Sequence, residues 1–190
     1  MNKNIVLCGV GGQGTVLASK LIAASAMQRG LPVMSAETIG MAQRGGSVFS
    51  NIRLGEGVHS PMIEKGTADL ILGFEPGEAV RMLPFLKRGG TVVTNSRAVV
   101  PASASLSGFD YRGETMVEYL GKVVQNLVVV DGPAACEALG SPRVLNMVLL
   151  GVAVRTGELG LSLEDLLAAL PSQVRPQFLE LNQQALTFQL

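Results

Sequence analysis

A glycine-rich turn between an apolar strand and a helix constrains this chain more than any other feature. Residues 5–8 form a short apolar run, and the glycine loop, residues 9–14, follows it directly. Apolar residues then recur at helical spacing from Thr15 to Arg29, and Gly30 ends the helix. Residues 31–36 predict a second strand. Together these segments predict a β-α-β unit with a parallel, right-handed connection.

The rest of the chain continues an alternation of strands and helices with one interruption. Residues 47–54 have strand composition, residues 55–57 a turn, and residues 58–60 are expected to pair back as an antiparallel hairpin. Further strands are expected at residues 70–73, 91–94 and 128–130, and helices at 78–86, 134–139, 142–156, 163–170 (with Ser162 as N-cap and Asp165 at the third helical position) and 177–188. The fold class is α/β, with a Rossmann-like, mostly parallel sheet, an antiparallel hairpin excursion and a helical C-terminal third, in a single domain over residues 1–190.

The glycine loop carries the pattern G-x-G-x-x-G at Gly9, Gly11 and Gly14, and Gly12 and Gln13 complete it. After a strand and before a helix, this pattern lets the backbone approach a bound phosphate. The same glycines could also serve only to pack the helix on the sheet. A P-loop is excluded because Thr15, not lysine, follows the last glycine.

Two other kinds of nucleotide site contain a similar glycine loop. A dinucleotide site needs an acidic residue at the end of the second strand, and Glu37 lies 23 residues after Gly14. A stand-alone NAD-binding dehydrogenase therefore stays open, as does a non-catalytic module that binds CoA or a nucleotide. An adenylating enzyme of the ubiquitin-activating type has a similar loop, but its Asp-rich strand end and zinc CxxC pairs are missing here.

A second motif, residues 37–48, follows the second predicted strand and is dense in glycine and polar residues. Ligand sites of parallel sheets collect at this edge of the sheet. Arg44 is placed to grip a phosphate or carboxylate through two hydrogen bonds, with Gln43, Gly45 and Gly46 beside it. A surface salt bridge is the alternative role for Arg44.

The composition argues for a chain that works inside a larger assembly. Fifteen Lys plus Arg balance fifteen Asp plus Glu, so a nucleic acid partner is not favoured. Only 16% of residues are charged while 47% are hydrophobic. The apolar run at residues 144–154 is shorter than the roughly 20 residues that a membrane span needs, and no signal peptide is evident, so a cytoplasmic chain is expected. The apolar excess then predicts a buried subunit interface near the glycine loops.

Cysteine usage excludes a metal centre on this chain. Cys8 and Cys136 lie far apart in the sequence, without a CxxC pair, and His59 is the one histidine. Neither a zinc site nor a cysteine-ligated iron–sulfur cluster can be built from these residues. His59 is expected to be a bystander.

The glycine loop and the motif Gly40-Met41-Ala42-Gln43-Arg44-Gly45-Gly46 together resemble the gamma-type subunit of 2-oxoacid:ferredoxin oxidoreductases, and most of all the small subunit of the indolepyruvate type. The resemblance covers most of the chain. Ile39 stands where the indolepyruvate type usually has His, so the 2-oxoacid stays open. The resemblance extends to residues 51–55, 68–76 and 89–93, Asn95 and Asn146.

The resemblance implies a subunit that is inactive alone as an oxidoreductase. Members of this family oxidise a 2-oxoacid to an acyl-CoA and CO2 and reduce ferredoxin. Thiamine diphosphate, Mg and the iron–sulfur clusters are expected on a large partner subunit, with ferredoxin reached through the complex and CoA possible at the interface. A homodimer is possible in isolation. For this chain we expect anion contacts from the glycine loop and Arg44, with Glu37, Glu75 and Asn95 as second-choice site residues. The alternative for Glu75 is a solvated loop carboxylate.

Overall fold

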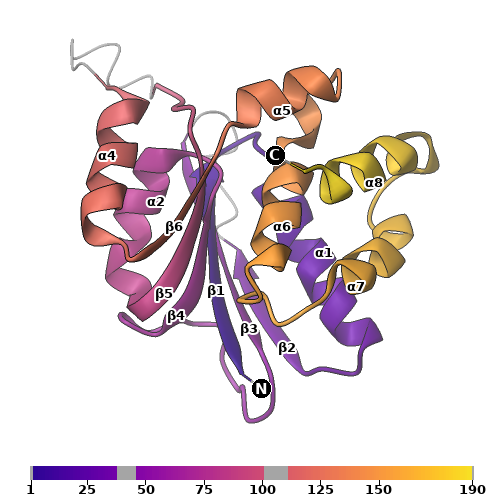
Figure 1. Cartoon of the computed structure of the whole chain (residues 1–190). Helices are drawn as coiled ribbons and strands as arrows, with labels where there is room; N and C mark the ends of the chain where they lie inside the picture. The colour runs from indigo at the N-terminus through magenta and orange to yellow at the C-terminus, as the bar shows by residue number, and fades with distance from the viewer. Residues whose placement is uncertain (1, 38–45, 101–110, 190) are drawn as a thin grey trace.

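The strands form one mixed sheet with helices packed on both faces (Figure 1). The computed structural model describes residues 2–37, 46–100 and 111–189. The strand order is β2-β3-β1-β4-β5-β6, in which β1, β4, β5 and β6 pair in parallel and β3 is antiparallel to both of its neighbours. The strands are β1 (Lys3–Val10), β2 (Val33–Glu37), β3 (Ser47–Leu54), β4 (Ala68–Gly73), β5 (Leu86–Asn95) and β6 (Asn126–Val130).

The helices lie in two layers. Figure 1 shows α2 and α4 on one face of the sheet, and α1, α6, α7 and α8 on the other. The α/β class and the helical C-terminal third are therefore confirmed. The helices are α1 (Thr15–Gln28), α2 (Pro76–Met82), α4 (Gly113–Val123), α5 (Gly132–Ala138), α6 (Leu145–Arg155), α7 (Leu163–Ala169) and α8 (Leu179–Thr187), with 3₁₀ turns at Leu83–Phe85, Pro142–Val144, Leu170–Ser172 and Pro176–Phe178.

The apolar runs of the sequence are explained by burial on both faces of the sheet. In β1, Ile5 and Leu7 belong to the core under α1 and α6, whereas Val6 and Cys8 belong to the core under α2 and α4. Successive side chains of a strand point to opposite faces, so a strand covered on both sides is apolar throughout.

The apolar run at residues 144–154 is likewise an interior element. It forms α6, which packs against α1, α5 and α8 as well as strands β4 and β5 and is almost entirely buried. Within the described residues, no helix combines the length and the apolar character that crossing a membrane requires.

The sequence predicted a β-α-β unit of neighbouring strands and an antiparallel hairpin, and the position of β3 shows that both predictions need correction. Strand β3 lies between β1 and β2, so those two strands run in the same direction but are not neighbours. The antiparallel excursion exists, but β3 pairs over its length with β1 and β2, and residues 58–60 form no strand. The reason is burial: Ile52 at the middle of β3 is fully buried, which a solvent-side hairpin could not provide.

Two other expectations from the sequence were wrong. The helix expected at residues 78–86 ends at Met82, because a 3₁₀ turn follows and Leu86 already belongs to β5. The strand expected at residues 91–94 begins earlier, at Leu86, so the paired glycines Gly89 and Gly90 lie inside β5, next to a register shift against β4. Helix α4 was missed altogether. Leu120 is its one large side chain that is fully buried, so its apolar stripe is short.

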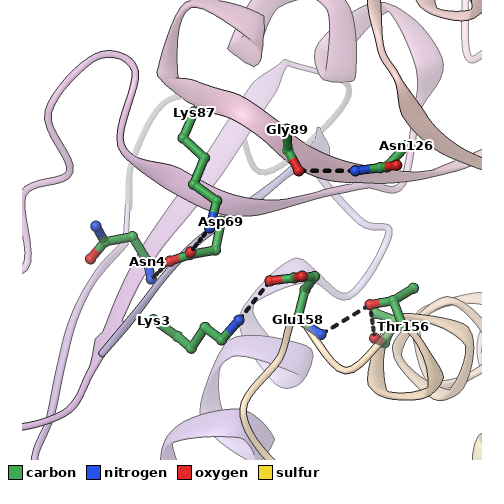
Figure 2. A network of polar contacts seen from close by, with 9 residues as sticks. Lys3, Asn4, Asp69, Lys87, Gly89, Asn126, Thr156 and Glu158 are labelled. Atoms are coloured by element: carbon green, nitrogen blue, oxygen red, sulfur yellow. Dashed lines mark hydrogen bonds and ion pairs between the residues drawn. The ribbon is translucent and has the colours of Figure 1, made fainter. Parts of the chain in front are cut away.

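Polar contacts hold the amino ends of the strands together (Figure 2). Asp69 at the start of β4 accepts a hydrogen bond from the backbone N–H of Asn4 at 2.8 Å and pairs with Lys87 of β5. Lys3 pairs with Glu158 at 2.6 Å, which fastens β1 to the segment after α6. These contacts leave the opposite, carboxyl edge of the sheet to carry the two motifs.

Candidate functional site

The glycine loop forms the tight turn that its sequence predicts. It connects the end of β1 at Val10 to the start of α1 at Thr15, and Gly12 and Gly14 have φ angles of 103° and 81°. Only glycine adopts this left-handed conformation without strain. Gly14 is the N-cap of α1 and lies against Asn146 of α6, whose side-chain amide donates to the Gly14 carbonyl at 3.4 Å.

The Gln13 side chain folds back into the loop that carries it. Its Oε1 accepts a hydrogen bond from the backbone N–H of Val10 at 2.7 Å, and its Nε2 donates to the carbonyl of Phe74 at 3.0 Å. Gln13 therefore ties the carboxyl end of β1 to that of β4. In dinucleotide-binding folds, ligands enter where neighbouring connections leave the sheet in opposite directions. In this protein that place lies between β1 and β4, and the side chain of Gln13 bridges it.

The second motif meets the first at the same edge. The backbone N–H of Gly11 donates to the carbonyl of Gly46 at 2.9 Å, just before β3 begins at Ser47. Gln43, Arg44 and Gly45 lie outside the described residues. The antiparallel direction of β3 makes this meeting possible, because its first residue pairs with the last residue of β1.

Glu75 is buried and accepts hydrogen bonds from three segments. Only 1% of it is exposed, so the alternative of a solvated loop carboxylate is wrong. As N-cap of α2, it accepts from the backbone N–H of Glu78 at 2.8 Å through Oε2. Its Oε1 accepts from the hydroxyl of Tyr111 at 2.8 Å and from the backbone N–H of Val99 at 3.4 Å. Burial raises the pKa of Glu75 above its ordinary value, and the hydrogen bonds offset part of that effect.

A second buried carboxylate, Glu78, was missed by sequence reasoning. Its Oε2 accepts from the hydroxyl of Ser47 at 2.5 Å and pairs with Arg81 at 3.3 Å. Burial, together with the nearby Glu78 and Glu75 carboxylates, raises the pKa of the Cys8 thiol well above its ordinary value. The spacing of Glu75 and Glu78, which places them at the N-cap and N3 positions of a helix, was the signal for this cluster.

Asn95 ends β5 at the same edge and is almost fully buried. Its Nδ2 donates to the carbonyls of Phe74 and Arg97 at 3.4 and 3.2 Å. Its Oδ1 has no hydrogen-bond partner among the described residues and lies against Gly132 of α5. Asn95 and Gly132 line a cavity of about 580 Å³.

Glu37 is not brought to the glycine loop. It ends β2, the edge strand, and β3 separates β2 from β1. With strands spaced about 4.8 Å apart, β2 lies about 10 Å from β1. A dinucleotide site needs the acidic strand end next to the glycine loop, so the stand-alone NAD-binding dehydrogenase is not favoured.

The described residues hold no group of three or more His, Cys, Asp and Glu that could bind a metal ion. Cys8 is buried in β1 and Cys136 is half-buried in α5, and both are free thiols. His59 lies exposed after β3.

Comparison with known proteins places this geometry in a family. Residues 4–187 match the family model described as pyruvate ferredoxin/flavodoxin oxidoreductase. The chain belongs to this family. The indolepyruvate oxidoreductase subunit IorB of Archaeoglobus fulgidus is 36% identical over 187 residues, covering 98% of this chain and 92% of the relative. The IorB subunit of Methanothermobacter thermautotrophicus is 38% identical over 188 residues, covering 97% and 94%.

Solved structures of the family share the fold. Pyruvate oxidoreductase subunit PORC from Thermotoga maritima superposes with a TM-score of 0.72 at 20% identity, covering 98% of this chain and 93% of that one. The 2-oxoglutarate:ferredoxin oxidoreductase from Magnetococcus marinus gives 0.70 at 19% identity, covering 97% of this chain but 30% of that one. In the latter protein, this fold is one part of a longer chain. The family comparisons confirm the resemblance drawn from the two motifs: this chain is the small subunit of a 2-oxoacid:ferredoxin oxidoreductase.

Proposed function

We propose that this subunit serves an enzyme that converts a 2-oxoacid and CoA to an acyl-CoA and CO2 while ferredoxin takes up the electrons. The substrate class is an aryl-pyruvate such as indolepyruvate, which the IorB relatives act on by name. The chain acts as one domain in the cytoplasm and reaches ferredoxin only through the complex. A homodimer is possible in isolation.

Thiamine diphosphate, Mg and the iron–sulfur clusters belong to a large partner subunit. The described residues do not fit these groups, because the two cysteines lie on different elements and no carboxylate cluster could hold a metal ion. An iron–sulfur cluster takes four cysteine ligands. The length of the Magnetococcus chain beyond this fold supports a large partner.

This chain contributes the entrance for CoA at the carboxyl edge of the sheet. The observation that carries this proposal is the hydrogen bond from Gly11 to Gly46, since it joins the glycine loop to the segment that directly follows Arg44 in the second motif. Gly12 is exposed there, and the N-cap Gly14 leaves the first N–H groups of α1 without a side-chain acceptor. Such a helix start, together with an arginine, suits the phosphates of CoA.

The other residues of the site hold this entrance in place. Gly9 lets the Gln13 side chain pack over β1, since a Cβ there would lie 2.7 Å from Gln13 Oε1. Glu75 and Asn95 fix the strand ends behind the loops. Gln43, Gly45 and Glu37 complete the second motif.

An arginine substitution tests the proposed CoA entrance. The chain is co-expressed with the large subunit, and CoA-dependent dye reduction by the 2-oxoacid is measured. Arg44→Ala should raise KM for CoA about tenfold, the loss of one charge-assisted contact, while KM for the 2-oxoacid stays constant. Arg88→Ala, at an exposed arginine at the other end of β5, is the matched control. An unchanged KM for CoA in an intact Arg44→Ala complex would overturn the role of Arg44.

A further inference from the structure

A groove of about 470 Å³ opens in the helical C-terminal third of the chain. It lies between the first turn of α1, the 3₁₀ turn Pro142–Val144 and the turn that leads into α8. Its volume falls in the range of about 300–1,000 Å³ that is typical of small-molecule sites. The lining residues are Leu17, Ser141, Arg143, Val144, Gln173, Val174, Arg175, Phe178, Leu181 and Asn182.

The floor of the groove is apolar. Val144 is buried, and Leu17, Val174 and Leu181 pack at the margin of the core. Phe178 stands at the opening with 40% of its surface exposed. An aromatic ring left exposed beside aliphatic side chains offers a flat surface for an apolar ligand.

The charged side chains that line the groove are all positive. Arg143 and Arg175 both line it and are exposed, and neither guanidinium forms an ion pair or hydrogen bond with a described residue. No aspartate or glutamate is among the described lining residues. Two unpaired cations beside a surface without acidic groups favour an anion.

The N-terminus of helix α8 adds to the positive electrostatic potential of the groove. Its N-cap is Phe178, which has no side-chain acceptor for the first N–H groups, and Leu181 and Asn182 of its first turns line the groove. The positive end of the helix dipole therefore borders the same space. Glu180 also lies in the first turn of α8 but is not among the lining residues.

We propose that this groove is a binding site for an organic anion with an apolar body, an aryl carboxylate in chemical class. The apolar floor and Phe178 take the body, and Arg143 and Arg175 take the carboxylate. The site belongs to this chain alone, so it does not depend on the function proposed above.

Two probes that carry the same aromatic ring but opposite charges test the proposal on the full chain. Binding of 1-naphthaleneacetate and 1-naphthylmethylamine is measured by calorimetry and by ligand-observed NMR. We expect saturable binding of the anion with Kd of about 1 mM or below and at least a tenfold weaker response to the cation. Equal affinity for both probes, or no saturable binding of the anion, would overturn the proposal.

Substitutions locate the binding. R143Q/R175Q should weaken binding of 1-naphthaleneacetate at least tenfold, and Phe178→Ser should weaken it as well, since the exposed ring of Phe178 stands at the opening of the groove. R88Q/K122Q removes two exposed cations elsewhere and should leave the affinity unchanged. If R143Q/R175Q bound 1-naphthaleneacetate with unchanged affinity, the anion would bind elsewhere on the chain and the proposed site in the groove would be refuted. Loss of binding when the large subunit is present would show that the partner covers the groove, and would equally refute a small-molecule site.

Discussion

At the scale of single residues, the polar groups at the carboxyl edge serve mainly to hold the loops. Gln13 uses both ends of its amide to join β1 and β4. Glu75 accepts hydrogen bonds from α2, from the segment after β5 and from Tyr111 ahead of α4. A ligand at this edge would therefore meet backbone groups and the helix start before it meets these side chains.

Gly14 should be the most sensitive glycine of the loop. In Gly14→Ala, the new Cβ would lie 2.6 Å from Asn146 Nδ2, in addition to the strain of a φ of 81°. Gly12→Ala has the strain alone, because nothing lies within 4 Å of its Cβ. We expect Gly12→Ala to lower the free energy of unfolding by about 1–2 kcal/mol and Gly14→Ala by clearly more, measured by urea unfolding. Equal losses in the two variants would mean that contact with Asn146 is unimportant.

At the scale of elements, the two ends of the sheet have different tasks. The amino ends are joined by short polar contacts, and the side chain of Asn126 adds one more from β6 to the carbonyl of Gly89 in β5 at 2.9 Å. The carboxyl ends carry the glycine loop, the start of β3 and the N-terminus of α2. The contacts at the amino edge support the fold, whereas the carboxyl edge of the parallel strands is where α/β proteins place ligands.

The amino-edge contacts should differ in their contribution to stability. Asp69→Ala removes an almost buried carboxylate and leaves the N–H of Asn4 without its acceptor, so we expect a loss of about 1–3 kcal/mol in the free energy of unfolding. Glu158→Ala removes a carboxylate that is more exposed than Asp69 and breaks its ion pair with Lys3, so it should cost at most about 1 kcal/mol. Chemical denaturation of both variants measures the two losses in the free energy of unfolding. A larger loss in Glu158→Ala than in Asp69→Ala would contradict the prediction.

At the scale of the whole molecule, the apolar composition is divided between two cores and a set of exposed side chains. The cores lie on the two faces of the sheet. The exposed residues include Val16 beside the glycine loop and Val99 and Val100 beyond the carboxyl end of β5, with Tyr119 and Val123 on α4. Val16, Val99 and Val100 support the proposal that the carboxyl edge meets the large subunit, whereas Tyr119 and Val123 line a cavity with Lys87 and Arg88 at the amino end of β5.

The stability of the molecule should depend on pH through Glu75. Its pKa is raised by burial in the fold, so the native state holds the proton more tightly than the unfolded chain does. The stabilisation by this group is complete below its ordinary pKa of 4.5 and is lost as pH rises through the raised native value. The free energy of unfolding of the wild type, relative to Glu75→Gln, should therefore fall as pH rises from 4.5.

Tyrosine variants provide the control for this pH dependence. The hydrogen bond from Tyr111 lowers the pKa of Glu75, so Tyr111→Phe should move the fall in stability to higher pH. Tyr119→Phe, at an exposed tyrosine on α4, should leave the curve in place. Thermal unfolding across the pH range measures all four proteins. A relative stability that stays flat or rises with pH would contradict the assignment to Glu75.

Local chemistry alone predicted several elements of this protein. The glycine loop and α1 follow from residues that are adjacent in sequence. Ser162 and Asp165 form the capping box of α7, in which each side chain accepts from the other residue's backbone N–H. The two motifs carried the family assignment, because their residue types and spacing are local properties of the chain.

Only the tertiary structure decided the placement of β3, the burial of Glu75 and the role of Gln13. Strand order depends on which apolar faces pack together, and residues far apart in sequence settle that choice. Glu37 has the spacing of a dinucleotide site, yet β3 lies between its strand and the glycine loop. Glu75 is a second-choice site residue of the sequence, and its burial beside Tyr111, which is distant in sequence, excludes the alternative of a solvated loop carboxylate. The sequence by itself determined the turns, the caps and the family; the position of each side chain relative to distant partners came from packing, because long-range contacts are not encoded in local spacing.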